Sequence, residues 1–475
     1  MRLRRPKAQP DTDKPINKIS SLKRIKSKNN SMNNTTASQP EVINKVKQTL
    51  SRHILADGFD FVMDLEKSQG SWIHDSLTGK NYLDMFSMFG SASIGYNHPY
   101  LVQHQNWLGK MAINKPTLAD VYSEEYAEFM EVFERVAIPE HLQYAFFISG
   151  GTLAVENAMK ACFDWKTRKN FEKDINVEGD ICIHFRQAFH GRSGYTLSLT
   201  NTSDPRKYQY FPKFDWPRII NPHLTFPITE ENLEETIKNE QLALLNIEEA
   251  ILSSPNRVAC IIIEPIQAEG GDHHFRDEFF RGLRDLCDQN EVLLIFDEVQ
   301  TGIGITGKMW AFEHFTAKPD IIAFGKKTQV CGVLANKEKF DEIPNNVFRE
   351  SSRINSTFGG NFIDMMRFKL ILEVIEKENL CQNAETVGSY LLNGLQQLAK
   401  KYPDVISNPR GRGLMCAFDL PDGAQRDRMR EILYEDHLII LPCGDQSLRF
   451  RPHLNVSQEE IQIALDKIEK LVSNH

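Results

Sequence analysis

The sequence predicts an α/β protein, in which a large domain with a mostly parallel sheet covered by helices accompanies a smaller α+β domain. From about residue 100, short, continuously apolar runs alternate with longer stretches of helical spacing. This alternation indicates parallel strands that are buried on both faces. After about Asn346 the pattern changes to long helices and short strands, which indicates a separate C-terminal unit.

The chain divides into four parts by composition and pattern. Residues 1–40 are expected to form a disordered basic tail, because Lys and Arg cluster there without apolar periodicity. A targeting peptide, or a true start at Met32, are the alternatives for this segment. Residues 41–98 are expected to begin the small domain, residues 99–345 to form the large domain, and residues 346–475 to complete the small domain.

The individual elements follow from the same patterns. Near the N-terminus we expect a helix over 41–55 and strands over 60–65, 71–75 and 82–85. The large sheet is expected to contain the apolar runs 144–148, 181–185, 258–263, 292–296 and 321–324. The C-terminal unit is expected to contain helices over 364–377 and 384–401 and strands over 413–420 and 437–441.

Charge and composition exclude several classes of function. The net charge of -8 argues against nucleic acid as the main partner, since phosphate binding needs clustered Lys and Arg. The eight cysteines form no Cys-x-x-Cys pair, so we expect a reducing, cytoplasmic location and no metal site. No apolar run reaches membrane-spanning length, so no membrane partner is expected.

Polar residues or glycines follow each apolar run of the large unit. They are residues 149–152, 186–192, Glu264, Asp297 and residues 325–327. In parallel sheets the ligand binds beyond the carboxyl ends of the strands. These residues therefore predict one site at one edge of the sheet.

Two of these residue types carry specific chemistry. Asp297 either caps a helix or forms a core salt bridge, or it pairs with the protonated ring nitrogen of a bound heterocycle that withdraws electrons. Lys326 and Lys327 are either solvated or include a desolvated nucleophile that can form a Schiff base. Neighbouring residues of an extended chain point in opposite directions, so only one of the two lysines should reach the site.

The remaining candidates bind charged or flat groups. Residues 149–152, Ser-Gly-Gly-Thr, precede a helical stretch and form either a plain turn or a phosphate site at the helix N-terminus. Phe189 could stack on a ring and Arg192 could pair with a carboxylate. Arg449 and Arg451 alternate with apolar residues, and by themselves they are expected to be surface charges.

Residues 302–307 match the dinucleotide pattern G-x-G-x-x-G. That pattern requires an acidic residue at the end of the next strand. The next strand, 321–324, ends in Gly325 and lysines instead. A nicotinamide-dependent dehydrogenase is therefore disfavoured.

Taken together, these residues resemble the class III aminotransferases of fold type I, which depend on pyridoxal 5'-phosphate. The resemblance rests on residues 296–302, Phe-Asp-Glu-Val-Gln-Thr-Gly, followed by residues 319–321, Pro-Asp-Ile, and by Gly325-Lys326. It extends from about residue 42 to the C-terminus and implies the fold type I architecture, with residues 99–345 binding the cofactor.

The resemblance also implies roles for single residues in cofactor binding. Lys326 forms the covalent link to the cofactor, and Asp297 binds its ring nitrogen. The other implied cofactor-binding residues are Gln300 near the ring hydroxyl, Gly151 and Thr152 at the phosphate, Phe189 against the ring, and Glu264. Ser356 and Thr357 are implied to reach the phosphate in the neighbouring subunit, which makes the active unit a homodimer.

The implied substrates are L-lysine, which reacts through its ε-amine, and 2-oxoglutarate. Further stretches that support this choice are 190–196, 211–218, 325–332 and 353–360. Arg192 is implied to bind the α-carboxylate of lysine, and Asn355 also belongs to the substrate site. Arg449 is implied to bind the carboxylate next to the keto group, and Glu269 to cover Arg449 until the keto acid enters.

Two departures from the family pattern concern specificity rather than the cofactor. Ala268 replaces a usual glycine beside Glu269, and Phe358 stands where tryptophan is common. The alternative substrates are ornithine and 4-aminobutyrate. A racemase on the same fold and a non-catalytic binding protein are also alternatives, but the retention of Arg449 and Glu269 favours a transferase with two substrates.

Overall fold

The computed structural model describes residues 39–473, and these residues fall into two compact units that meet at Asp57 and Gly58. Within the first unit, helix α1 (Gln39–Leu50) covers most of the predicted helix 41–55. The predictions for the basic tail and for a start at Met32 lie outside the described residues, apart from Gln39 and Pro40, which begin α1.

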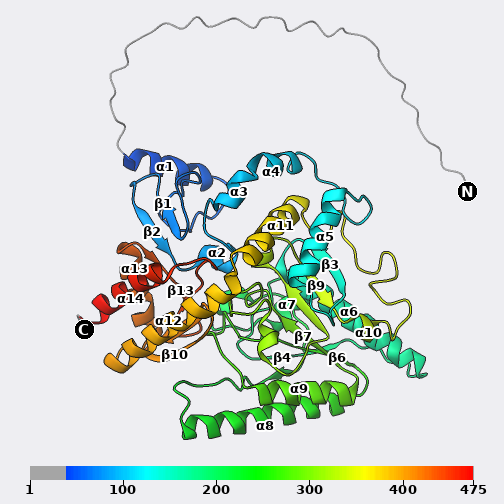
Figure 1. Ribbon diagram of the computed structural model, residues 1–475. Helices are drawn as coiled ribbons and strands as arrows, with labels where there is room; N and C mark the ends of the chain where they lie inside the picture. Colours follow the sequence, from blue (N-terminus) through cyan, green and yellow to red (C-terminus); the bar gives the residue numbers. More distant parts are fainter. Residues whose placement is uncertain (1–38, 474–475) are drawn as a thin grey trace, which may run out of the picture. The chain divides into compact units, whose positions relative to one another are not determined.

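A seven-stranded sheet forms the centre of the second unit (Figure 1). Its order is β3 (Tyr144–Ile148), β9 (Cys331–Ala335), β8 (Ile321–Phe324), β7 (Leu293–Asp297), β6 (Val258–Ile263), β4 (Ile181–Phe185) and β5 (Arg218–Ile219). Strand β9 is antiparallel to both of its neighbours, and the other strands run in one direction. The predicted mostly parallel sheet is confirmed, and its carboxyl ends share one edge.

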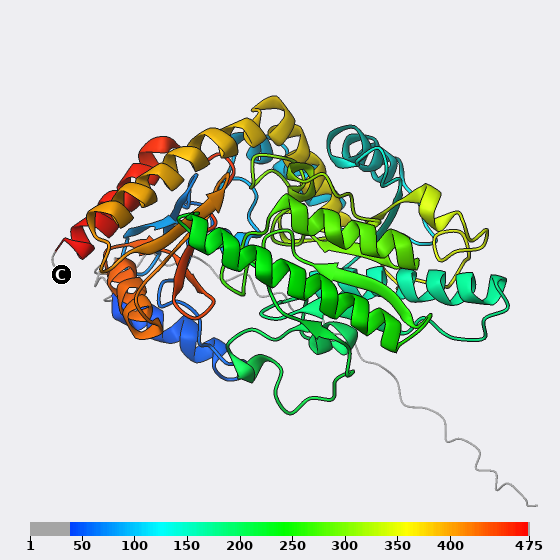
Figure 2. The ribbon, with the colours of Figure 1, turned by 90° about the horizontal axis from the view of Figure 1, so that it is seen from below.

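Long helices cover this sheet because each buries one apolar face. Helix α6 (Gly151–Glu172) packs on β6, β8 and β9, whereas α9 (Asp277–Asn290) packs on β7. In α9, Phe279, Leu283 and Cys287 recur every four residues and are buried. Figure 2 shows α8 (Glu230–Ser253) lying beside α9. Helix α5 (Glu124–Ala137) packs on α11 (Phe362–Lys377), which confirms the predicted helix 364–377.

Two smaller sheets complete the second unit. A three-stranded sheet pairs β1 (Trp72–His74) and β2 (Asn81–Asp84) with β12 (Leu438–Ile439), so residues from both ends of the chain lie together. A four-stranded sheet has the order β10 (Ser407–Arg412), β11 (Met415–Asp419), β14 (Ser447–Phe450) and β13 (Leu441–Cys443). The helices of this region are α12 (Leu380–Lys401), α13 (Gly423–Glu435) and α14 (Gln458–Val472). The domain limits after residues 98 and 345 stay predictions.

Two strand predictions need correction. Residues 60–65 do not form a strand, and only Met63 makes an isolated bridge, to Asp75. The predicted strand 437–441 is split into β12 and β13, which belong to different sheets. The pattern of alternating residues fits an extended chain in both places, but a strand also needs a partner along its whole length.

Short elements connect the larger ones. They are α2 (Ser87–Gly90), α3 (Pro99–Gln103), α4 (Gln105–Met111), α7 (Gly194–Leu199), α10 (Lys337–Phe340), and the 3-10 helices η1 (Pro205–Lys207), η2 (Ala311–His314) and η3 (Lys326–Thr328). Between residues 39 and 473, the helices are all too short or too polar to cross a membrane.

Candidate active site

A cavity of about 460 Å³ lies at the carboxyl edge of the large sheet. It is lined by most of the residues that the sequence singled out, namely Gly151, Thr152, Phe189, Arg192, Glu264, Glu269, Asp297, Gln300, Lys326 and Arg449. These residues come from the ends of five strands of the large sheet (β3, β4, β6, β7 and β8) and from β14 of a small sheet. Residues that are far apart in the sequence therefore meet at one site.

Lys326 lies in the reversal that connects β8 to β9. Its backbone is left-handed, with φ 54°, an uncommon conformation for a residue other than glycine. Its Nζ atom donates a hydrogen bond to the carbonyl oxygen of Phe89 at 3.1 Å. Burial, together with the positive charge of Arg449, lowers the pKa of Lys326 to about 8. The neutral, nucleophilic amine is therefore far more accessible than in an exposed lysine.

Lys327 has a different environment from Lys326. It is buried, and its Nζ atom donates to the carbonyl oxygen of Gln300 at 2.9 Å. Burial, followed by the charge of Arg451, lowers the pKa of Lys327 well below its usual value. Only Lys326 lines the cavity, as expected, but the reason differs: the two lysines begin the 3-10 turn η3 rather than an extended segment.

Asp297 ends β7 at the bottom of the cavity and is 4% exposed. Its Oδ2 atom lies 2.8 Å from Nδ1 of His190, and its Oδ1 atom accepts the backbone N–H of Val299 at 3.1 Å. The sequence contains no signal that marks His190 as the partner, because the two residues are 107 positions apart. This pairing fixes the orientation of the carboxylate toward the cavity.

The N-terminus of α6 forms the phosphate-sized end of the cavity. Gly150 precedes the helix with φ 102°, and no side chain caps the free N–H groups of the first turn. A Cβ atom on Gly151 would lie 3.1 Å from Cγ1 of Val299, so a larger residue would crowd the cavity. Uncapped N–H groups at a helix N-terminus attract an anion such as phosphate.

Glu264 connects two walls of the cavity. Its Oε1 atom accepts the backbone N–H of Phe189 at 3.0 Å, and its Oε2 atom accepts that of Ala268 at 3.1 Å. Burial raises the pKa of Glu264 to about 7; the charge of His190 opposes this shift, and that of Asp297 adds to it. Glu264 thus holds Phe189 and the segment before Glu269 in place.

Arg449 is buried in the substrate end of the cavity. Its Nη2 atom lies 2.6 Å from Oε2 of Glu269, while Oε1 of Glu269 lies 2.6 Å from Nζ of Lys207. Burial favours the neutral form of Glu269, but Arg449 and Lys207 outweigh it and lower the pKa of this carboxyl. The expectation that Arg449 and Arg451 are surface charges is wrong, because both are buried and Arg451 is paired with Asp272.

Arg192 differs from Arg449 in exposure. It is exposed and lines the same cavity, and it forms no ion pair with any of the side chains described between residues 45 and 473. Asn355, Ser356 and Thr357 do not line the cavity of their own chain. Asn355 and Thr357 are exposed, and the side chain of Ser356 accepts the N–H of Gly359 at 3.0 Å.

The glycine pattern 302–307 does not form a dinucleotide-binding turn. It lies between β7 and η2, and no long helix follows it. A Cβ atom on Gly302 would lie 2.7 Å from the ring of Trp310, so this glycine is needed for close packing. The structure therefore agrees with the rejection of the dehydrogenase interpretation.

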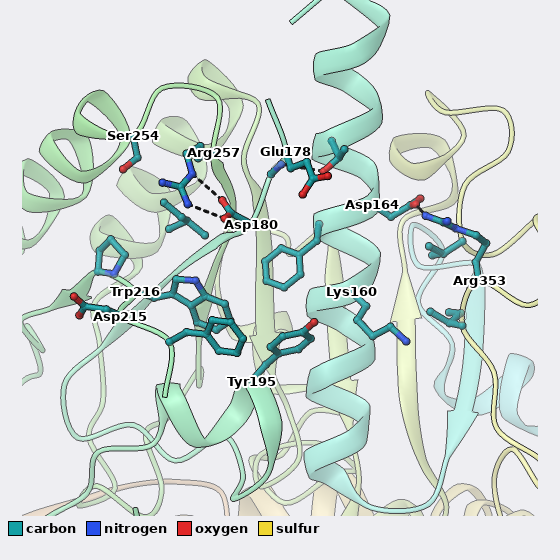
Figure 3. Close-up of a pocket in the computed structure, with 18 residues that line it drawn as sticks. Lys160, Asp164, Glu178, Asp180, Tyr195, Asp215, Trp216, Ser254, Arg257 and Arg353 are labelled. Atoms are coloured by element: carbon teal, nitrogen blue, oxygen red, sulfur yellow. Dashed lines mark hydrogen bonds and ion pairs between the residues drawn. The ribbon is translucent and has the colours of Figure 1, made fainter. Parts of the chain in front are cut away.

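A second cavity, of about 720 Å³, shares no lining residue with the first (Figure 3). Its aromatic wall includes Trp216 and Tyr195, whose ring centres are 5.9 Å apart. Arg257 lies 2.7 Å from Asp180 at its rim, and Arg353 is paired with Asp164. Both arginines are therefore already paired with carboxylates, and among the described residues Lys160 is the lining cation of this cavity that forms no ion pair.

Fold and site together define an enzyme that depends on pyridoxal phosphate. Lys326 is a nucleophile of lowered pKa, and Asp297 is a buried carboxylate that suits a protonated ring nitrogen. The uncapped N-terminus of α6 suits the phosphate, and Oε1 of Gln300 is buried without a partner where a ring hydroxyl would fit. The residues present therefore fit this cofactor.

Comparison with known proteins gives the family. The family model for Aminotransferase class-III matches residues 55–472, so the chain belongs to the class III aminotransferases, which are pyridoxal-phosphate enzymes. The L-lysine-epsilon aminotransferase of Amycolatopsis lactamdurans is 48% identical over 427 residues, which cover 89% of this chain and 94% of that protein. The human mitochondrial 4-aminobutyrate aminotransferase is 34% identical over 84% of this chain and 82% of that protein.

A solved structure supports the same conclusion. The lysine aminotransferase from Mycobacterium tuberculosis in the internal aldimine form superimposes with a TM-score of 0.88 and 49% identity. The superposition covers 90% of this chain and 98% of that one. The predicted fold, enzyme class and cofactor are therefore confirmed.

Proposed function

We propose that this enzyme transfers the ε-amino group of L-lysine to 2-oxoglutarate, giving 2-aminoadipate 6-semialdehyde and L-glutamate. One observation carries the proposal: the cavity holds two arginines, of which Arg449 is covered by Glu269 and Arg192 is free. Arg449 is close enough to Lys326 to lower the pKa of its amine. A covered arginine near the nucleophile and a second, open arginine in the same cavity suit a donor whose reacting amine lies far from its carboxylate. The relatives named for lysine support the choice of donor.

In the first half-reaction the free cation positions the donor. Arg192 pairs with the α-carboxylate of lysine, and the long side chain then presents the ε-amine to Lys326. Meanwhile Glu269 neutralises Arg449, so that the α-carboxylate is not drawn toward the nucleophile. The distal carboxylate thus selects the ε-amine rather than the α-amine.

Proton transfer falls to Lys326. When bound, the cofactor supplies an electron sink that acidifies the C–H bond next to the reacting nitrogen. Lys326 would hold the cofactor, and its amine, once free, would take that proton and return it as the general acid. Its pKa of about 8 keeps a useful fraction of the amine neutral near pH 7. Asp297, held by His190, would be the partner of the ring nitrogen.

The second half-reaction uses the other arginine. The carboxylate of 2-oxoglutarate that adjoins the keto group pairs with Arg449, and Glu269 has to leave Arg449 for this to happen. The distal carboxylate then lies toward Arg192. One cavity therefore accepts two unlike substrates in turn, which gives ping-pong kinetics.

The proposal includes a homodimer in which Asn355, Ser356 and Thr357 complete the partner's site. These residues lie off their own cavity, and Phe89, which lines the cavity, is 57% exposed. Mixing Lys326→Ala chains with Thr357→Ala chains tests this. A shared site predicts that mixed dimers regain activity, because one of the two sites then contains neither change. Activity that never exceeds the sum of the separate chains would contradict it.

The alternative donors are ornithine and 4-aminobutyrate, and the two-arginine arrangement by itself also accepts ornithine. A racemase would not need an arginine that a carboxylate covers. A non-catalytic protein would not need the nucleophile, the buried carboxylate and the arginines together. A cytoplasmic location also stays a prediction.

The deciding experiment is an absorption titration of the purified enzyme. The substrate L-lysine should bleach the visible absorption band of the cofactor attached to Lys326, and 2-oxoglutarate should restore that band. Ornithine and 4-aminobutyrate should bleach it much less. A band that responds to another amine but not to lysine would contradict the donor and leave the family intact.

A further inference from the structure

We propose that Lys207 is the second anchor of the gate formed by Glu269: it holds the carboxylate of Glu269 while Arg449 is uncovered. In this way Lys207 sets how readily the enzyme changes from the amine donor to the keto acid. The inference rests on the proposed function, because it presumes that Glu269 leaves Arg449 in the second half-reaction.

The carboxylate of Glu269 bridges two cations. One oxygen lies 2.6 Å from Arg449, and the other lies 2.6 Å from Nζ of Lys207. Arg449 alone would neutralise one carboxylate. The closed gate, in which Glu269 pairs with Arg449, therefore does not need the charge of Lys207. Among residues 45–473, whose side chains the structure describes, Glu269 is also the only acidic group within ion-pair distance of Lys207. The charge of Lys207 is therefore paired with the gate carboxylate.

The backbone around Glu269 is fixed. The carbonyl oxygen of Glu269 accepts the N–H of Gly444 at 3.0 Å, and the N–H of Ala268 is bound to Glu264 at 3.1 Å. A Cβ atom on Gly270 would lie 2.3 Å from the carbonyl oxygen of Gln187, so the chain has no room beside it. Opening must therefore occur by rotation of the Glu269 side chain, with the backbone staying in place.

Lys207 can follow that rotation. Its backbone ends the short turn η1, which begins with Pro205 and is capped by Asp204, whose Oδ1 atom accepts the N–H of Arg206 at 3.1 Å. Its side chain has a flexible four-carbon stem. The ammonium lies inside the cavity, 5.9 Å from the centre of the Phe189 ring. A fixed base with a mobile charged end keeps contact with a carboxylate that rotates.

Energetics make this anchor useful. Both Glu269 and Lys207 are about three-quarters buried, with side-chain exposures of 25% and 26%. A carboxylate that leaves its only cation in such a place loses pairing without regaining full hydration. With Lys207 present, Glu269 gives up one of two partners instead of its only partner. Lys207 also competes with Arg449 for the carboxylate in the closed state, which lowers the barrier further.

The test separates the two half-reactions in the complete enzyme loaded with its cofactor. In Lys207→Met, the rate with L-lysine should stay within about twofold, while the KM for 2-oxoglutarate should rise about tenfold, the factor typical of one charge-assisted contact. Calorimetry with glutarate, which cannot react, should show an affinity about tenfold weaker. Lys207→Arg should restore both values.

A matched control and a second background keep the result unambiguous. Arg206→Met removes the same charge one residue away, on a side chain that is 82% exposed and does not line the cavity, and should change neither value. In a Glu269→Gln enzyme, Lys207→Met should have no further effect on glutarate, because the bridging carboxylate is gone.

The possible failures are distinguishable. Equal losses in both half-reactions, or unchanged glutarate binding in Lys207→Met, would overturn the anchor. Tighter glutarate binding would also overturn it, since Lys207 would then hold the gate closed. If the unaltered enzyme does not accept lysine and 2-oxoglutarate, or if Glu269→Gln leaves the two half-reactions equally active, the proposed function itself fails.

Discussion

The two ends of the active-site cavity are built in different ways. At the cofactor end, Asp297 ends β7, Lys326 lies in the turn directly after β8, and the N-terminus of α6 follows directly after β3. At the substrate end, Lys207 and Glu269 lie on connecting segments, and Arg449 lies on a strand of a separate sheet. The cofactor end has short links to the large sheet, whereas the substrate end is built from long side chains, which the proposed function requires to exchange partners.

This difference separates chemistry from selection. A change at the cofactor end should reduce both half-reactions, because both use the same lysine and the same carboxylate. A change at the substrate end should affect one half-reaction more than the other, because each substrate meets a different set of cations. The following predictions test that separation, and the Lys207 variants extend it.

The largest effect is expected for Lys326→Ala. Loss of the amine that moves the proton should lower both half-reactions by at least about 10³-fold. The visible absorption band of the cofactor attached to Lys326 should disappear. Lys327→Met is the contrasting variant and should keep the band, because Lys327 faces the carbonyl oxygen of Gln300 instead of the cavity. A band that survives in Lys326→Ala and is lost in Lys327→Met would reverse the assignment.

Asp297→Asn should reduce both half-reactions by roughly 10²- to 10³-fold, the range for one preorganised electrostatic contact in an active site. The amide keeps the shape of the carboxylate but removes the charge that faces the ring nitrogen. Stopped-flow absorbance with each substrate separately measures the two rates. A loss confined to one substrate would show that the cofactor end also takes part in selection.

Glu269→Gln should act on one half-reaction. Arg449 then stays uncovered and attracts the α-carboxylate of lysine, which presents the wrong amine. The rate with L-lysine should fall roughly 10- to 100-fold, the scale of an unpaired buried charge, while the rate with 2-oxoglutarate changes little. The same stopped-flow comparison measures it, and equal losses would contradict a gate.

The smallest effect concerns pH. The pKa of Lys326 in the folded chain, about 8, lies below its ordinary value of 10.5, so the amine becomes neutral as the pH rises through 8. Attachment of pyridoxal phosphate to the cofactor-free enzyme should therefore speed up roughly tenfold between pH 7 and 9. It should level off above that range. Stopped-flow absorbance follows the attachment, and a midpoint near 10.5 would show that Lys326 is not desolvated.

The same pKa shift also makes the stability of the folded chain depend on pH. Between the two pKa values the unfolded chain binds the proton of Lys326 and the folded chain does not. The contribution of Lys326 to the free energy of unfolding therefore rises with pH between about 8 and 10.5. Chemical denaturation of the cofactor-free enzyme, compared with Lys326→Met, isolates this contribution.

The cofactor end was largely predictable from the sequence. Uninterrupted apolar runs can be recognised in the sequence without knowing which strands pair with one another. In a parallel sheet, the residues that follow these runs all lie at the same edge. Lys326, Asp297 and Gly151 could be located in this way. The resemblance to a family then supplied their roles, and it alone supplied Glu269 and Arg449 as a pair.

The substrate end was not predictable from local pattern, because its contacts are distant in the sequence. Arg449 looks like a surface charge until Glu269, 180 positions away, is seen to cover it. Lys207 belongs to a polar loop in which nothing marks one lysine among several charged residues. Strand β9 was missed for a related reason: Gly332 interrupts its apolar run, and only its pairing with β3 and β8 defines it.

Strand β9 has a consequence for how the enzyme is made. It lies between β3 and β8, so residues 144–148 pair with a segment that is synthesised nearly two hundred residues later. Lys326 lies in the short connection between β8 and β9, where its backbone is left-handed. Such distant pairings form slowly during folding. The site around Lys326 is therefore complete only in a chain whose β3, β8 and β9 have paired, although these strands are far apart in the sequence.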